Sequence, residues 1–429
     1  MASLNPLLQE VKDNLTSFIE NINCIHETYA YSEIMLYEQH KKAQKNYDDF
    51  IKTFRKEIES HHEYVYIPDN KYRQYSKLQK KYKRAQQSFK IIPPSYLVTL
   101  VSEFDLFYAG LVKCVYNICP DKLKESEMAF YYRDLQTLES LKDVKNKIIN
   151  KCIEDRLRDS HTKQFGWLAK ALSVEDLTKF EGWAEFVELT ERRNLFVHAS
   201  GIVSVQYITE CEKYQKLPNE VILGTQLSVD QDYFEKSYRL LYKIGIMLTQ
   251  MVLRCLYLPN NIDESSAIDE ILISNVYELI SDELYDVAID VSEFILQNKK
   301  FKHNSFDRGY IILNLAQAHK WNNNNSRCLE ILDAEDWSAS TNELLMPVFV
   351  LRENYDEVYK RMRELGDKNI NLTISSYMEW PIFKLLREQK EFMSIFEEIF
   401  GESQIKEHKI EREANTLTKD KDLTQTIAL

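Results

Sequence analysis

The sequence predicts a mainly α-helical protein, and two observations support this fold class. Gly and Pro number only nine each in 429 residues, whereas the helix-favouring residues Leu, Lys and Glu are abundant. Apolar residues recur at spacings of three and four over long stretches. One β-branched run, 202–208, reads as a short strand or an extended loop, with 221–223 as its expected partner. The length allows two or three domains, each with its own core.

Residues 1–90 are expected to form a helical N-terminal region. Apolar residues at helical spacing predict two long helices over 5–64. A Pro-Asp-Asn run at 68–70 interrupts the pattern, and a basic helix follows to about residue 89. The adjacent prolines Pro93 and Pro94 mark the expected boundary to the next domain, because each proline removes a helix hydrogen bond.

Positive charge is concentrated in residues 40–90, which hold 14 Lys and Arg against 6 Asp and Glu. The whole chain carries −12, which argues against a general nucleic-acid coat protein. The aromatic and apolar residues of 71–84 share one helical stripe. This stripe predicts either a core-facing surface with a solvated basic back, or a helix whose basic face tracks RNA phosphates, and both can hold together. The residues of that basic face are Lys77, Lys80, Lys81, Lys83 and Arg84.

The second domain, 91–258, is expected to be a helical bundle. Ser173 begins a capping-box-like start for the helix that carries the motif described below. The apolar stretch 244–258 is too short to span a bilayer and includes Gln250 and Arg254, so we expect a buried helix and no membrane association. The predicted helices of this domain cover 95–118, 136–158, 161–171, 174–198 and 229–257.

The most informative motif lies near the end of the helix predicted over 174–198 and consists of Arg193, Asn194 and His198. Arginine holds phosphates through a planar fork of donors, and histidine transfers protons near neutral pH. Asn194 and His198 are four apart and share a helix face. Arg193 and His198 lie about 140° apart on an ideal helix. They would converge only if the helix breaks, for which 199–201 is suited, or if a second copy faces the first.

The motif is moderately specific. Chance alone gives roughly 0.4 Arg-x-x-x-x-His matches in such a chain, and the requirement for Asn after the Arg lowers this to roughly 0.02 to 0.03. The alternative is a structural histidine at a helix end, paired with a local carboxylate such as Glu191. Under that interpretation the motif stabilises the helix end and carries no chemistry.

This motif resembles that of the HEPN family, a helical domain whose ribonuclease members carry an Arg followed four to six residues later by His, often with Asn after the Arg. The resemblance covers roughly 90–258. It includes the helix that begins near Pro94, which looks like the first core helix of the family. An acidic residue of that helix often faces the catalytic groups in the family, and here the candidates are Glu103 and Asp105.

The resemblance implies a metal-independent endoribonuclease without a cofactor. His198 would act as general base on a ribose 2′-OH, Arg193 would hold the phosphate oxygens, and Asn194 would orient one of these partners. The expected products are 2′,3′-cyclic phosphate and 5′-OH ends. Paired motifs are common in the family, so we expect a homodimer in which the partner's His198 serves as general acid. The implied setting is a gated, cytoplasmic toxin or antiphage defence effector.

The main alternative is a catalytically silent, HEPN-like scaffold or partner-binding protein. A third interpretation is a nucleotidyltransferase partner or an antitoxin-type component, either of which needs a second protein. If the protein is a scaffold, His198→Ala lowers stability more than activity.

The segment 259–266 is the clearest linker in the sequence, and the chain changes character after it. Residues 267–401 resemble a degenerate array of tetratricopeptide-type helix pairs, whose usual period is near 34 residues. A non-repeating helical bundle is the alternative. Concave helical arrays bind partners, so this region is the expected sensor of a protein or ligand trigger. The polar residues 402–429 are expected to form a disordered tail.

Other chemistry has little support in the sequence. It contains no phosphate-binding P-loop, no G-x-G-x-x-G and no G-x-S-x-G motif. The seven cysteines have no zinc-like spacing, and the adjacent His61 and His62 lack residues to complete a metal site. No basic, apolar leader is present at residue 1, which with the cysteine pattern indicates a cytoplasmic protein with reduced thiols.

Overall fold

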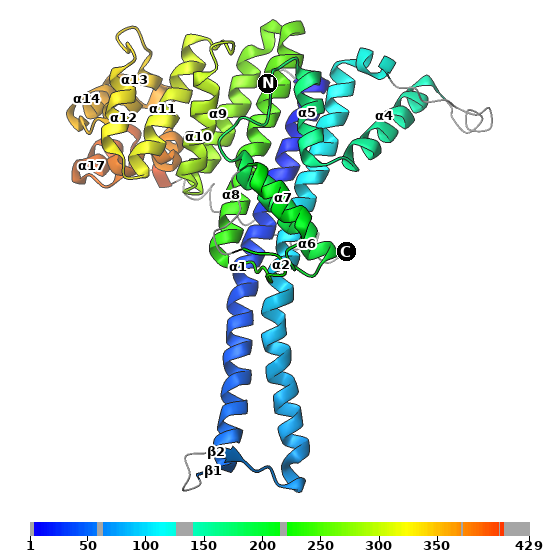
Figure 1. Ribbon diagram of the computed structural model, residues 1–429. Coiled ribbons are helices and arrows are strands. Elements are labelled where there is room, and N and C mark those ends of the chain that lie inside the picture. Colours follow the sequence, from blue (N-terminus) through cyan, green and yellow to red (C-terminus); the bar gives the residue numbers. More distant parts are fainter. Residues whose placement is uncertain are drawn as a thin grey trace. The chain divides into compact units, whose positions relative to one another are not determined.

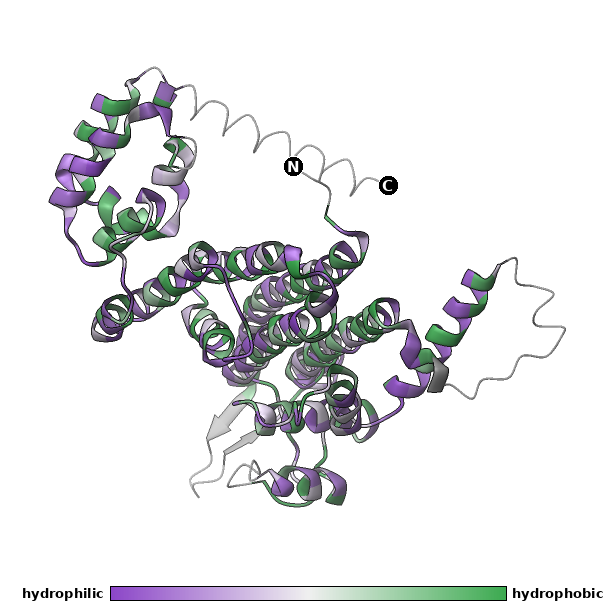
Figure 2. Ribbon diagram, turned by 90° about the horizontal axis from the view of Figure 1, so that it is seen from above, coloured by the Kyte–Doolittle hydropathy of each residue, from purple (hydrophilic) through white to green (hydrophobic). Residues whose placement is uncertain are grey.

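A computed structural model of the protein describes residues 4–57, 63–125, 140–214, 221–369, 372–402 and 404–406. The described chain is mainly helical, as the sequence predicts. It divides into two compact units between Asn261 and Ile262, inside the segment that the sequence marks as a linker. The helices carry hydrophobic and hydrophilic residues along the same element (Figure 2), so each unit can bury one face of its helices.

The first unit contains the candidate site and two very long helices. Its two short strands pair in antiparallel register, with Lys56 opposite Tyr64. The elements in chain order are α1 (Pro6–Phe54), β1 (Arg55–Glu57), β2 (Glu63–Val65), α2 (Asp69–Ile118), η1 (Pro120–Glu125), α4 (Leu141–Leu157), α5 (His161–Leu172), α6 (Trp183–His198), α7 (Val205–Lys213), α8 (Gln231–Val252), the π-helical η2 (Leu253–Tyr257) and η3 (Leu258–Asn260).

Helices α1 and α2 run side by side over much of their length (Figure 1). The side chain of Asn5 caps α1 by accepting a hydrogen bond from the backbone N–H of Leu7 at 3.0 Å. Over 5–64 the sequence predicted two helices, but α1 is unbroken to Phe54. In its second half the buried residues fall seven apart, which is the repeat of a two-helix coiled coil and explains the continuity. These residues are Tyr29, Leu36, Ala43 and Phe50.

The expected boundary at Pro93 and Pro94 is wrong, because α2 continues through both prolines. Both rings are buried, and the Ser95 hydroxyl donates to the carbonyl of Ile91 at 2.8 Å within the same turn. Packing along α1 therefore outweighs the two lost backbone donors. As a result the regions expected as 1–90 and 91–258 are parts of one compact unit.

The motif helix also differs from its prediction. Ser173 does not begin it; this residue ends α5 in a left-handed conformation at φ 56°. Helix α6 starts at Trp183, after Gly182 at φ 105°. The predicted strand is mostly the helix α7, which the Ser204 hydroxyl caps by accepting from the N–H of Tyr207 at 3.3 Å. Propensity favoured a strand here, but the cap starts a helix.

Only a short extended piece remains before α7. Ile202 forms an isolated antiparallel bridge with Gln226, and Val203 N–H donates to the carbonyl of Thr225 at 2.9 Å. Residues 225–226 therefore take the pairing role that was expected of 221–223.

The apolar helix predicted near the end of this unit is α8 with its continuation to Asn260. By length and composition alone Gln231–Asn260 passes the test for a membrane span, but 78% of its most apolar window is buried inside the protein. Gln250 and Arg254 are buried as well, and Arg254 Nε donates to Gln250 Oε1 at 3.0 Å. The helix is packed as a core helix of the unit.

The second unit is a series of helix pairs. The first helices of successive pairs, α9, α11 and α13, pack against one another. One core cluster runs from Ile312 to Ile405, and α9 and α10 bury further apolar residues, among them Leu272 and Val291. The elements are η4 (Ile262–Glu264), α9 (Ser265–Ser281), α10 (Tyr285–Gln297), α11 (Ser305–Trp321), α12 (Asn325–Asp333), α13 (Asn342–Leu351), α14 (Tyr355–Leu365), η5 (Gly366–Lys368), α15 (Ile374–Glu379), η6 (Pro381–Phe383), α16 (Lys384–Arg387) and α17 (Lys390–Phe400).

The turn inside each of the first three pairs has the same geometry. Glu283, Asn323 and Glu353 each stand two residues before the second helix and adopt φ near 60° (60°, 60° and 57°). In every case the next residue donates its N–H to the carbonyl five positions earlier. A turn repeated at intervals of 40 and 30 residues is typical of a helix-pair array. The likeness to tetratricopeptide repeats specifically stays a prediction.

The first part of the tail predicted over 402–429 is not disordered. Residues 404–406 are helical and Ile405 is buried in the core of the second unit. Residue 403, the range 407–429 and the pair His61 and His62 lie outside the described residues. Buried Ile405 shows that the apolar pattern of the array extends past residue 401.

Candidate functional site

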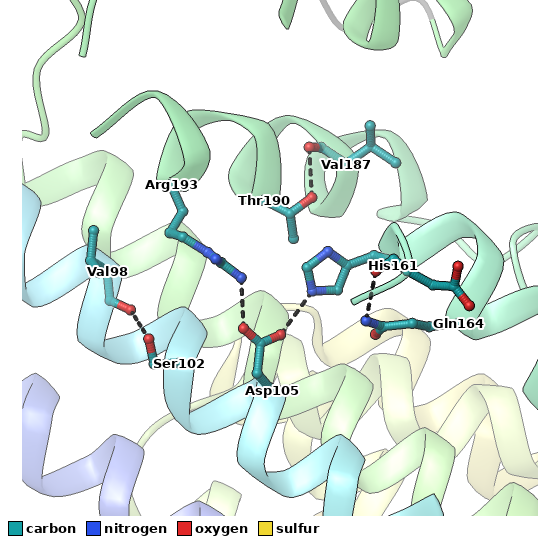
Figure 3. A network of polar contacts seen from close by, with 9 residues as sticks. Val98, Ser102, Asp105, His161, Gln164, Val187, Thr190 and Arg193 are labelled. Atoms are coloured by element: carbon teal, nitrogen blue, oxygen red, sulfur yellow. Dashed lines mark hydrogen bonds and ion pairs between the residues drawn. The ribbon is translucent and has the colours of Figure 1, made fainter. Parts of the chain in front are cut away.

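A carboxylate of α2 joins the motif helix to a histidine of α5. Asp105 Oδ2 accepts from Arg193 Nη2 at 2.6 Å, and its Oδ1 lies 2.9 Å from His161 Nε2. Figure 3 shows the Asp105 side chain between the guanidinium and the imidazole. Arg193 and Asp105 are separated by 88 residues and His161 and Asp105 by 56, so three distant segments build this cluster.

An aromatic layer brings the three helices together. The Phe186 ring of α6 lies 5.1 Å from that of Phe104 on α2 and 5.2 Å from that of Phe165 on α5. The His161 ring meets the Phe186 ring edge-on at 5.4 Å. Phe104, Phe165 and Phe186 are fully buried. Because Asp105 follows Phe104, burial of that ring fixes the side of α2 from which the carboxylate projects.

The structure distinguishes the two acidic candidates. Asp105 contacts Arg193, whereas Glu103 accepts from Asn21 Nδ2 of α1 at 2.8 Å. Two positions apart on a helix is about 200° of rotation, so the two carboxylates face different neighbours. The supporting acid of the cluster is therefore Asp105.

A cavity of about 620 Å³ opens beside this cluster. Its lining includes Asp105, His161, Arg193 and Asn194 from the candidate site. The other charged side chains along it form a balanced set, so with Arg193 and Asp105 the cavity has four fixed cations and four carboxylates. These further residues are Arg158, Asp159, Lys163, Glu191, Glu210 and Lys213. An anion here would be held by particular contacts, because the summed charge is near zero.

Glu191 is a second carboxylate of this cavity. Burial raises its pKa above the ordinary value of 4.5, and hydrogen bonds from Gln206 and Asn194 partly oppose the rise. The Gln206 amide donates to it at 3.2 Å. The sequence offered Glu191 as the partner of His198; instead it bonds to Gln206 and to the motif residue Asn194.

His198 lies apart from the cluster. The helix breaks where expected, because Ala199 and Gly201 both donate to the carbonyl of Leu195, and Gly201 takes φ 79°. This break leaves the His198 side chain exposed and outside the cavity lining. Within one protomer Arg193 and Asn194 therefore both line the cavity, whereas His198 does not.

His161 is the site residue that the sequence did not reveal. It opens α5 directly after Ser160 and no motif surrounds it. Nothing in the sequence around His161 indicates that Asp105 lies opposite it. The only signal in the sequence was Asp105 itself, because a half-buried carboxylate needs a hydrogen-bonding or charged partner.

Adjacent arginines of the motif have different surroundings. Arg192 Nε donates to Glu188 at 2.7 Å, and its guanidinium lies 3.8 Å from the centre of the Tyr233 ring. The hydroxyls of Tyr207 and Tyr233 also donate to Glu188, at 2.5 and 2.7 Å. This buried network ties α6 to α7 and α8. Arg192 is thus structural, and Arg193 is the arginine that faces the cavity.

The predicted basic face lies on α2. Its stripe packs on α1 through Tyr75 and Tyr82, whose rings lie 6.1 and 5.4 Å from that of Tyr47, while Tyr72 is exposed. By helix rise its nearest basic residue is about 30 Å from Asp105 along α2. All five basic side chains are exposed: Lys77, Lys80, Lys81, Lys83 and Arg84.

Among the described residues no group of three or more His, Cys, Asp or Glu side chains is placed to hold a metal ion. Comparison of the chain with protein-family models, with curated proteins and with solved structures finds no match. The geometry of the site and the resemblance of its motif are therefore the basis on which a function can be inferred.

Proposed function

We propose that the protein is a metal-independent endoribonuclease that uses the cavity beside Asp105. The observation that carries this proposal is the cluster of Arg193, Asp105 and His161 on a cavity wall that also holds Asn194. Among the described residues the Arg193 side chain donates a hydrogen bond to Asp105 alone, which leaves guanidinium donors for a phosphate.

The proposed chemistry is attack of a ribose 2′-OH on the adjacent phosphorus. Arg193 binds the non-bridging oxygens and stabilises the charge of the transition state. One histidine takes the proton of the 2′-OH, and a second donates a proton to the 5′-oxygen as the P–O bond breaks. The products are a 2′,3′-cyclic phosphate and a 5′-OH. Asn194 orients the phosphate or Glu191.

The two histidines of this proposed mechanism belong to different protomers. His161, oriented by Asp105, already lies on the cavity wall. His198 is exposed at the end of α6 and is flanked along the chain by the exposed apolar residues Val197, Ile202 and Val205. An exposed apolar patch supports docking of a second copy. A two-fold homodimer would place the partner's His198 at the cavity and complete the site.

The resemblance to HEPN ribonucleases suggests the biological setting. An active RNase would harm its own cell, so we infer a cytoplasmic toxin or antiphage effector that is gated. The helix-pair array of the second unit is the proposed sensor of a protein or ligand trigger. The exposed basic face of α2 is a secondary RNA contact, too far along the helix to touch the scissile phosphate.

The second candidate function is a scaffold or partner-binding protein. It is favoured by one specific observation: Asp105 satisfies both Arg193 and His161, as in a stabilising network. On this interpretation loss of either partner lowers stability and changes no activity.

The decisive experiment incubates the purified protein with total RNA in excess EDTA. Arg193→Ala, His161→Ala and His198→Ala proteins, shown by circular dichroism to be folded, are compared with the unmodified chain. Loss of a positioned acid or base should lower the rate on the order of 10²- to 10⁴-fold, and end-group analysis should find cyclic phosphates. Equal cleavage by all four proteins would refute this site.

A mixing experiment tests the homodimer. If the site combines Arg193 of one protomer with the partner's His198, a mixture of inactive Arg193→Ala and His198→Ala proteins regains part of the activity. A mixture that stays inactive, although both proteins dimerise, contradicts the shared site. If no protein cleaves, residues 1–261 are assayed alone because they lack the proposed gate, and inactivity there favours the scaffold.

A further inference from the structure

A second cavity of the first unit has a chemistry unlike that of the candidate site. It measures about 310 Å³, at the small end of the range for ligand pockets. Four elements contribute to its wall: α2, η1, α4 and α5. The lining residues are Tyr116, Lys122, Cys152, Arg156, Trp167, Lys170 and Ala171.

The described lining contains three cations and no carboxylate. Arg156 has a partial counter-ion in Asp159, 3.7 Å away, but no ion pair joins Lys122 or Lys170 to an acidic side chain of the described chain. Three basic side chains around one small cavity repel one another unless an anion is bound. The candidate active-site cavity, in contrast, balances its cations with carboxylates.

Two aromatic rings and a planar guanidinium line the same cavity. The Trp167 ring lies 5.6 Å from the Tyr116 ring, and the Arg156 guanidinium lies 5.2 Å from the centre of the Trp167 ring. An indole and a guanidinium both offer planar surfaces on which a heteroaromatic ring stacks. Burial raises the pKa of Tyr116 to about 12, Cys152 adds to this rise and Arg156 opposes it, so the phenol keeps its proton as a neutral donor.

We propose that this cavity binds a free mononucleotide, or another small phosphate ester that carries a heteroaromatic ring. The phosphate would pair with Lys122, Lys170 and Arg156, and the base would stack on Trp167. The volume suits one such molecule and no longer chain, which favours a free ligand. The site is distinct from the cluster at Asp105 and does not depend on ribonuclease activity.

The test is isothermal titration calorimetry of the full chain with three probes. AMP carries both phosphate and ring, ribose 5-phosphate lacks the ring, and adenosine lacks the phosphate. We expect AMP to bind at least tenfold more tightly than either fragment, because both halves of the site contribute. Absence of AMP binding, or equal affinity for AMP and one fragment, would overturn the proposal.

Variants locate the binding. Lys170→Gln changes an exposed cation of the lining, and Trp167→Leu removes the stacking surface; each should weaken AMP binding tenfold or more. Lys142→Gln, an exposed lysine on α4 outside the cavity, is the matched control and should bind as the unmodified chain does. AMP binding that Lys170→Gln leaves intact would place the nucleotide elsewhere and refute the assignment, even if Trp167→Leu fails to fold.

Discussion

At the residue scale, one carboxylate organises the candidate site. Asp105 holds a guanidinium from α6 and an imidazole from α5 through its two oxygens. A carboxylate in this position fixes the ring orientation and the tautomer of a histidine. The proposed chemistry therefore depends on the charge of Asp105 as well as on its shape.

Asp105→Asn tests this dependence. It keeps the size of the side chain and removes the charge that orients His161 and holds Arg193. We expect RNA cleavage to fall on the order of 10²-fold, as for loss of an oriented acid or base. Glu103→Gln is the control, because Glu103 bonds to Asn21 and not to the cluster. A rate constant equal in both variants would argue against the role of Asp105.

Glu191 predicts a pH dependence of stability. Its pKa is raised above 4.5 by burial, so the folded protein binds this proton more tightly than the unfolded chain does. Below 4.5 the group is neutral in both states and has no effect. As the pH rises past that value, Glu191 loses its proton in the unfolded chain but keeps it in the folded protein. The free energy of unfolding therefore falls until the pH exceeds the folded-state pKa.

Glu191→Gln should remove that loss. In denaturant titrations the gain in stability of the variant over the unmodified protein should grow as the pH rises above 4.5 and should be absent at the acidic end. A difference that does not change with pH would mean that burial does not control this carboxyl group.

At the scale of elements, the end of α6 depends on a glycine. Gly201 has φ 79°, and a Cβ there would lie 2.7 Å from Phe196 and 2.8 Å from Gln226. Gly224 has a similar φ of 83° but open space around it. The two positions separate backbone strain from steric overlap.

Gly224→Ala should cost about 1–2 kcal/mol, from the left-handed backbone alone. Gly201→Ala should cost roughly 1–3 kcal/mol more, because Phe196 and Gln226 must also move. Chemical denaturation of both variants measures the difference. Equal losses of unfolding free energy would show that the contacts around Gly201 relax freely.

Some helix ends were predicted correctly from the sequence, whereas elements whose form depends on packing or on an overlooked cap were not. The end of α5 and the break after His198 follow from short-range rules. The prolines 93 and 94 violate such a rule, yet α2 continues because long flanking faces pack on α1. Residues 202–208 have strand propensity, but a serine cap and burial of Tyr207 favour a helix.

At the scale of the whole molecule, two compact units predict two unfolding events. Each unit has its own buried core, and one core cluster of the second unit runs from Ile312 to Ile405. Scanning calorimetry of the full chain should give a calorimetric enthalpy larger than the van't Hoff enthalpy. Residues 1–261 alone should unfold in a single transition. One two-state transition for the full chain would contradict independent units.

The helical class, the linker region and the motif that puts Arg193 and Asn194 on one helix can all be predicted from the amino-acid sequence alone. These follow from spacings within a few turns, where helix geometry fixes which residues share a face. The folded chain is needed to see that Asp105 rather than Glu103 contacts Arg193, that His161 joins them, and that His198 lies outside the cluster. Those outcomes depend on which helix faces pack together across 56 and 88 residues of chain, and a buried aromatic layer sets that packing.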